Sequence, residues 1–195
     1  MRLSLAIFAR ALVLAAVAVW VPGLALAGEA TAFDLIKEGN RYVGEQSKDK
    51  IVQLRSEKSV GTLTPNIWYV VFYDPDATFK ATEVKFGAGQ KMKVTRPMRV
   101  LELGSGDNKA LDHSKLKVDS DKAIKLATAE PLLKSLTLKA TKLTLQHSDD
   151  GPVWKATLWA AKLRNPAANA DVGSVFVAAD TGKVIRTDLH IKSVD

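Results

Sequence analysis

The sequence predicts an α+β fold in which two short helices each pack against antiparallel β-strands. Apolar and polar residues alternate over many short segments, which is the spacing expected for strands. The connections between these segments are short, whereas parallel neighbours need crossovers of a dozen residues or more. The same order of elements, a helix followed by several strands, occurs twice in the 195 residues. We therefore expect two tandem modules, each a helix packed on an antiparallel β-sheet.

The first predicted helix begins after Thr31, whose hydroxyl is a suitable cap. Gly39 and Gly44 weaken the helical pattern and are expected to end it. Its inward face should carry Ala32, Leu35, Ile36, Tyr42 and Val43.

The strands predicted to follow are 51–58, 67–73, 79–86 and 92–94, with a further stretch at 98–103. Most of them alternate apolar and polar residues, so one face of the sheet should be in water. The stretch 67–73 differs because it is apolar on both faces. It is either a central strand covered on both sides or a strand that contributes to an interface.

In the second half, Ser120 is the candidate cap of the helix, and Pro131 should end it because the residue before a proline avoids helical geometry. The inward face of this helix should carry Ala123, Ile124 and Ala127. The strands predicted after it are 141–147, 153–163, 174–179 and 183–191.

Residues 1–27 have the three regions of a secretory signal peptide. Arg2 and Arg10 precede an uncharged apolar run, and the small-residue pattern at 25–27 predicts cleavage after Ala27. A membrane anchor is the alternative, but the apolar stretch is marginal for crossing a bilayer. We expect a periplasmic or secreted protein without stable membrane insertion once the leader is removed.

Beyond the leader, we expect a first module at 28–103, a polar and glycine-rich linker at 104–117, and a second module at 118–195. The leader carries two arginines and no acid, so its removal lowers the formal charge from +7 to +5. A basic protein of this kind favours acidic proteins or anionic surfaces as partners. Nucleic acid is not predicted, because the arginines are not interleaved with aromatic residues.

The second half resembles the PepSY domain family over Val118 to Ile191. The resemblance lies in the helix start at 120–124, the strand at 153–158 and the stretch 175–185, which is similar to the closing hairpin of that family. The first half is a weaker match, and its turn at 87–91 lacks the aspartate. The resemblance implies a PepSY-like or cystatin-like module, export to the cell envelope, and a role in binding or restraining peptidases. It brings no catalytic motif.

Composition and motifs argue against catalysis and against a bound cofactor or metal. The chain has no cysteine, which excludes disulfides, thiolate metal sites and cysteine nucleophiles. It has no Gly-x-Ser-x-Gly elbow. The histidines are His113, His147 and His190, of which the last two could meet if their strands pair. Their spacing does not suggest a metal site, so no cofactor, metal or catalytic residue is predicted.

The aromatic strands are the strongest candidates for partner binding. Large rings stand on both faces of their strands, so one set must contact something other than its own helix. Either the two halves contact each other there, or the rings form a surface for a partner. The candidate residues are Trp68, Tyr69, Tyr73, Trp154 and Trp159.

Three functions are compatible with these observations. The first is a non-catalytic binding or regulatory protein that acts on an envelope protein or peptide, for which a peptidase is one candidate. The second is a binder of an anionic envelope polymer. The third is a small envelope enzyme with a pocket between helix and sheet and with His147 or His190 as its base.

Overall fold

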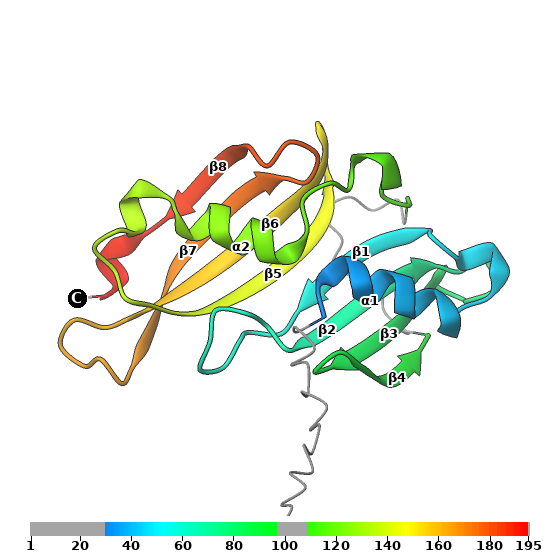
Figure 1. Cartoon of the computed structure of the whole chain (residues 1–195), viewed down its shortest axis with the longest axis horizontal. Coiled ribbons are helices and arrows are strands. Elements are labelled where there is room, and N and C mark those ends of the chain that lie inside the picture. Colours follow the sequence, from blue (N-terminus) through cyan, green and yellow to red (C-terminus); the bar gives the residue numbers. More distant parts are fainter. Residues whose placement is uncertain (1–29, 97–108, 195) are drawn as a thin grey trace, which may run out of the picture.

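In the part of the chain that the structure describes, one continuous eight-stranded antiparallel sheet carries two α-helices on the same face (Figure 1). The computed structural model describes residues 30–96 and 109–194, so the expected leader lies outside the described residues. The strand order is β4-β3-β2-β1-β5-β6-β7-β8. The predicted α+β class and antiparallel pairing are confirmed. The prediction that each half forms a separate sheet is wrong.

The helices are α1 (Ala32–Gly39) and α2 (Ser120–Thr128). The strands of the first half are β1 (Ile51–Ser56), β2 (Ile67–Tyr73), β3 (Ala81–Gly87) and β4 (Gln90–Thr95). Those of the second half are β5 (Leu138–Ser148), β6 (Gly151–Ala161), β7 (Asn169–Ala178) and β8 (Val184–Leu189). Short 3₁₀ helices are η1 (Asn40–Tyr42), η2 (Glu45–Ser47), η3 (His113–Lys115), η4 (Pro131–Leu133) and η5 (Ile191–Val194). The predicted stretch 98–103 lies outside the described residues.

The two halves join through β1 and β5. Leu54 lies opposite Leu145 at this junction. The Ser56 hydroxyl accepts a hydrogen bond from the Leu143 amide at 2.9 Å, and beyond the strand the Ser59 amide donates to the Thr141 carbonyl at 2.8 Å. Without this contact, β1 and β5 would each present a row of unpaired backbone N–H and C=O groups. Pairing the two strands satisfies these groups on both.

The capping box at the start of α1 confirms Thr31 as the cap. The Thr31 side chain accepts from the Asp34 amide, and the Asp34 carboxylate accepts from the Thr31 amide. The helix ends at Gly39, the first of the two glycines expected to end it, so Tyr42 and Val43 lie beyond the helix. Gly39 is also a point of close approach, because a Cβ there would lie 2.8 Å from the ring of Phe72 on β2. Tyr42 does not continue the helix but lies in η1, half-buried against the core.

The cap of α2 is Asp119, so the prediction of Ser120 is wrong by one residue. Ser120 is the first helical residue, and its hydroxyl accepts from the Ala32 amide of α1 at 3.0 Å. Asp119 accepts from its own helix at the Ser120 amide and from the Phe33 amide of α1 at 3.2 Å. The two helix N-termini therefore meet and share acceptors.

The main core lies between the helices and the sheet. The predicted inward residues of α2, which are Ala123, Ile124 and Ala127, are all buried. Trp154 of β6 is fully buried and stacks on Phe33 of α1, with ring centroids 6.5 Å apart. The helix of the first half thus packs on a strand of the second, which ties the two halves together.

The closing hairpin between β7 and β8 forms as predicted. The Ala178 amide donates to the Lys183 carbonyl, and Gly182 has a positive φ of 76°. Val177 and Ile185 lie on paired strands, but Val177 faces Val184 because the register shifts at this point. Of the expected linker, residues 104–108 lie outside the described residues, and the remainder contains η3 and the buried Leu111.

Candidate binding surface

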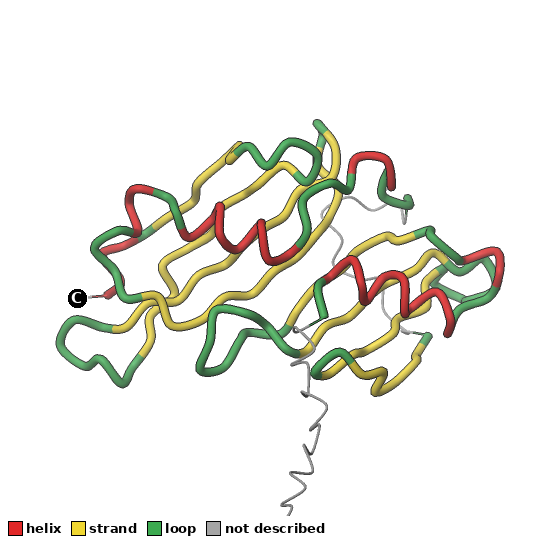
Figure 2. The backbone as a smooth tube through the Cα atoms, in the orientation of Figure 1, coloured by secondary structure: helices red, strands yellow, loops and turns green. Residues whose placement is uncertain are grey.

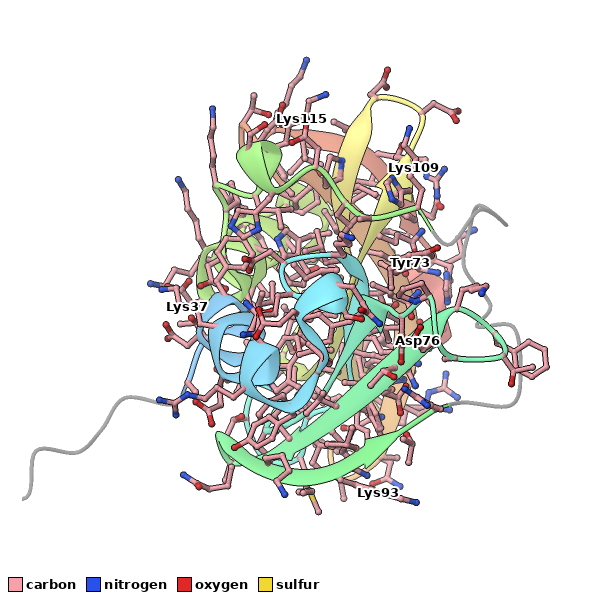
Figure 3. All side chains as sticks on the ribbon, turned by 90° about the vertical axis from the view of Figure 1, so that its right-hand side faces the viewer. Lys37, Tyr73, Asp76, Lys93, Lys109 and Lys115 are labelled. Carbon is pink, nitrogen blue, oxygen red and sulfur yellow. The ribbon has the colours of Figure 1, made fainter. Side chains whose placement is uncertain are left out.

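The sheet face opposite the helices is the candidate functional surface, and we call it the outer face. Figure 2 shows both helices on the near side of the strands, and among the described residues no helix covers the other side. In Figure 3, which views the molecule from its β4 side, Lys37 of α1 and Lys93 of β4 point to opposite sides of the sheet. The outer face is therefore the broad side of the sheet that no described helix covers.

A single row of residues crosses the outer face from one edge of the sheet to the other. Each member is the Cα partner of the next, so strand pairing places them side by side. At about 4.8 Å per strand, the row spans roughly 34 Å. We call this set the outer row: Lys93, Lys85, Tyr69, Arg55, Thr144, Lys155, Phe176 and Arg186.

In the first half of the row, two cations lie over the ring of Tyr69. The Arg55 guanidinium is 4.5 Å from the ring centroid and the Lys85 ammonium is 4.9 Å from it. Both cations also have carboxylate partners, since Arg55 pairs with Glu83 at 2.7 Å and Lys85 with Glu57 at 3.1 Å. Lys93, at the β4 end of this half, forms no ion pair with another described residue, so this half of the row keeps one uncompensated positive charge.

Mutual hydrogen bonds shift the pKa values in this network. The Tyr69 hydroxyl donates to Glu57, and this bond, with that from Lys85, lowers the pKa of Glu57. Contacts with Tyr69 and Glu57 raise the pKa of Lys85. Both shifts favour the charged forms, so the pair is ionised over the neutral range.

In the second half of the row, carboxylates again compensate only part of the positive charge. Phe176 lies under the Arg186 guanidinium at 3.8 Å and has the Lys155 ammonium 5.9 Å from its centroid. Arg186 pairs with Asp188 at 3.1 Å. Lys155 and its outer-face neighbour Lys142 form no ion pair within the described part of the chain. The uncompensated positive charge of this half of the outer face therefore lies on β5 and β6.

The five predicted aromatic residues divide between the two faces of the sheet. Trp68 and Trp154 are buried beneath the helices, and their indole N–H groups donate to the carbonyls of Pro65 and Val118 at 2.9 and 2.7 Å. Tyr69, Tyr73 and Trp159 lie on the outer face and are half-buried. Only these three could touch a partner without disturbing the core.

Two of these outer-face residues have well-defined surroundings. Tyr73 packs against a small apolar cluster of Val52, Val71 and Ala81. The ring of Trp159 lies under the Lys58 ammonium, 4.4 Å from its centroid. Together with Tyr69 and Phe176, Trp159 gives the outer face three rings that hold cations in place.

Sequence analysis missed the charged members of the row and Phe176. Alternation along each strand does place Arg55, Lys85 and Lys155 on the polar face. It does not show that they lie in one line, because that depends on which strands are neighbours and in which register they pair.

The histidines do not come together. His147 lies on β5 and His190 follows β8, with β6 and β7 between them. The His147 Nε2 atom is 2.6 Å from the Lys109 carbonyl, and the exposed His190 is 3.6 Å from an Asp171 carboxylate oxygen. Within residues 30–96 and 109–194, no group of three histidine or acidic side chains could hold a metal ion.

Two surface depressions adjoin the histidines. One, of about 340 Å³, has Val153, Phe176 and Ile185 on its lining together with His147, Asp149 and Arg186. The other, of about 180 Å³, lies beside α1 and is lined by Phe33, Ile36, Lys37, Asp49, His113 and Leu116. Neither brings His147 and His190 together.

No helix in the described ranges has the length and apolar character needed to span a bilayer. Comparisons of the chain with protein-family profiles, with curated proteins and with solved structures found no match. The resemblance to the PepSY family therefore stays a prediction, and the outer face is the basis on which function is inferred.

Proposed function

We propose that this is a non-catalytic binding protein of the periplasm or the extracellular space, which holds an acidic protein or peptide against its outer face. The observation that carries the proposal is the outer row, in which cations from neighbouring strands stand over aromatic rings. The PepSY resemblance makes a peptidase one candidate partner, and the predicted leader provides the route of export.

The arrangement suits recognition because its charges are already held in position. A guanidinium 3.8 Å from a ring, as in Arg186 over Phe176, has lost much of its freedom before a partner arrives. Binding then costs less side-chain entropy than it would with free cations. The unpaired Lys142 and Lys155 provide positive charge that no carboxylate of the described residues neutralises.

The size of the surface supports a protein partner. A standard interface buries about 800 Å² on each side. A row of roughly 34 Å, with the residues above and below it on each strand, is wide enough for such a contact. Because the face combines rings with cations, we expect hydrophobic contact as well as charge attraction to contribute to affinity.

The test compares two charge-reversal variants of the purified protein. One carries Lys142→Glu and Lys155→Glu on the outer face, and the matched control carries Lys37→Glu and Lys122→Glu on the helix side. Partners captured from envelope extract are identified and titrated against the wild type and both variants. We expect the outer-face variant to lose about tenfold or more in affinity, with the control close to wild type.

Equal losses in the two variants would contradict a specific surface and leave only the effect of net charge. Capture of lipid or polysaccharide alone, with binding that falls steeply as salt rises, would favour the anionic-polymer alternative instead. Protein recognition led by aromatic contacts should respond much less to salt, so the same titration at low and high salt separates the two.

A further inference from the structure

We propose that the free edge of β4 is a docking strand for an extended, acidic segment of the partner, which adds to the sheet beside it. This rests on the proposed function, because it names the part of the molecule that takes a peptide and the chemistry of that peptide. The outer row does not require it, so the two can fail separately.

The backbone of β4 is available for pairing. Within residues 30–96 and 109–194 no strand lies beyond β4, and all of its residues up to Val94 are exposed. An edge strand presents N–H and C=O groups that have no partner in the sheet. Two large apolar side chains are exposed on the same strand, Met92 at 57% and Val94 at 41%, whereas β8 has only Ile185. Unpaired backbone and uncovered apolar surface thus coincide at one edge.

The charges of β4 determine which peptide fits. Lys91 and Lys93 lie on the strand, Arg96 follows it, and the strand itself contains no acidic residue. Lys91 is 5.3 Å from the ring centroid of Tyr42, and Arg96 pairs with Asp74. The opposite edge differs, because on β8 the charge of Arg186 is met by Asp188 of the same strand. An acidic segment is therefore attracted to β4 rather than to β8.

The two faces of β4 differ in chemistry, which defines the pattern of the incoming strand. Val94 lies opposite Val84, on the helix side, while Lys93 lies opposite Lys85, on the outer face. Residues of an added strand alternate between the same two faces. A segment that alternates apolar residues with carboxylates would place the first beside Val94 and the second beside Lys93.

The same features disfavour a second copy of this chain at this edge. Two β4 strands would bring lysines of like charge together, which is destabilising. An acidic partner removes the charge conflict and gains main-chain hydrogen bonds in its place.

The test uses synthetic ten-residue peptides that alternate glutamate and valine, with blocked ends. A second peptide carries N-methyl groups on alternate amides, which removes donors from one edge and leaves the side chains in place. A third alternates lysine and valine. We expect the first peptide to bind and to slow hydrogen exchange at β4 amides, and the other two to bind at least about tenfold more weakly.

Two protein variants complete the design. Lys93→Glu, on the outer face of β4 beside the expected carboxylates, should weaken binding of the glutamate–valine peptide about tenfold, and Thr187→Glu on β8 should leave it unchanged. Equal binding of the methylated and unmethylated peptides, slowed exchange away from β4, or no binding at millimolar peptide would each overturn the proposal.

The outcomes also separate this inference from the proposed function. In one outcome, the variant with Lys142→Glu and Lys155→Glu loses partner binding, and the peptides do not bind at β4. This result would support the outer face as the binding surface and contradict the proposed docking strand. In the other outcome, the peptide binds at β4, and the outer-face variant still binds the partner as the wild type does. This result would support β4 as a docking strand and contradict the role of the outer row in partner binding.

Discussion

Asp74, at the end of β2, is a buried carboxylate whose partners determine its ionisation. Its side chain is 8% exposed. It accepts from the Thr82 hydroxyl at 2.6 Å and from the Asp76 amide at 3.0 Å, and Arg96 lies 3.2 Å away. Burial alone would raise the pKa of Asp74, but these hydrogen bonds and the Arg96 charge outweigh burial and lower it.

We predict that Asp74→Asn destabilises the protein most at neutral pH. A lowered pKa in the folded state stabilises the fold above the ordinary value of 3.8, and this stabilisation is lost as the pH falls through the folded-state pKa. Urea unfolding should show a gap of about 1–3 kcal/mol between wild type and variant near pH 7, and a smaller gap near pH 2.5. A gap that is constant with pH would show that the Asp74 charge plays no part.

At the level of elements, the meeting of the two helix N-termini depends on Asp119. Its carboxylate accepts from the Ser120 amide of α2 and the Phe33 amide of α1, so it serves both helices. Both termini carry partial positive charge, which a carboxylate placed between them offsets.

We predict that Asp119→Ala lowers the free energy of unfolding by about 1–2 kcal/mol, toward the upper end for a cap, because two helices lose an acceptor. Asp112→Ala is the control: Asp112 caps the exposed η3 through Ser114, and its loss should cost about 0.5 kcal/mol or less. Urea unfolding measures both. Similar losses in the two variants would show that the contact with α1 adds nothing.

The elements themselves could largely be predicted from the sequence, but their neighbours could not. Periodicity located α1, β2 and the hairpin before β8 because it reports local geometry and burial. It could not show that β1 pairs with β5, since both halves read as complete sheets. For the same reason the outer row could not be predicted. The sequence also could not distinguish Trp154, which lies in the core, from Trp159, which lies on the outer face.

For the whole molecule, the shared sheet and the packing of Phe33 on Trp154 predict that both halves unfold together. Native-state hydrogen exchange should give the Val70 amide of β2 and the Ala156 amide of β6 the same opening free energy and the same denaturant slope. Values that differ by more than about 1 kcal/mol would show that one half opens while the other stays folded.

The β1–β5 junction has one more consequence, which concerns aggregation. Leu54 faces Leu145 and the Ser56 hydroxyl accepts from the Leu143 amide, so each strand covers the edge that the other would otherwise expose. Halves of the chain produced separately would each present this edge to water, and exposed edges of this kind promote strand-to-strand aggregation.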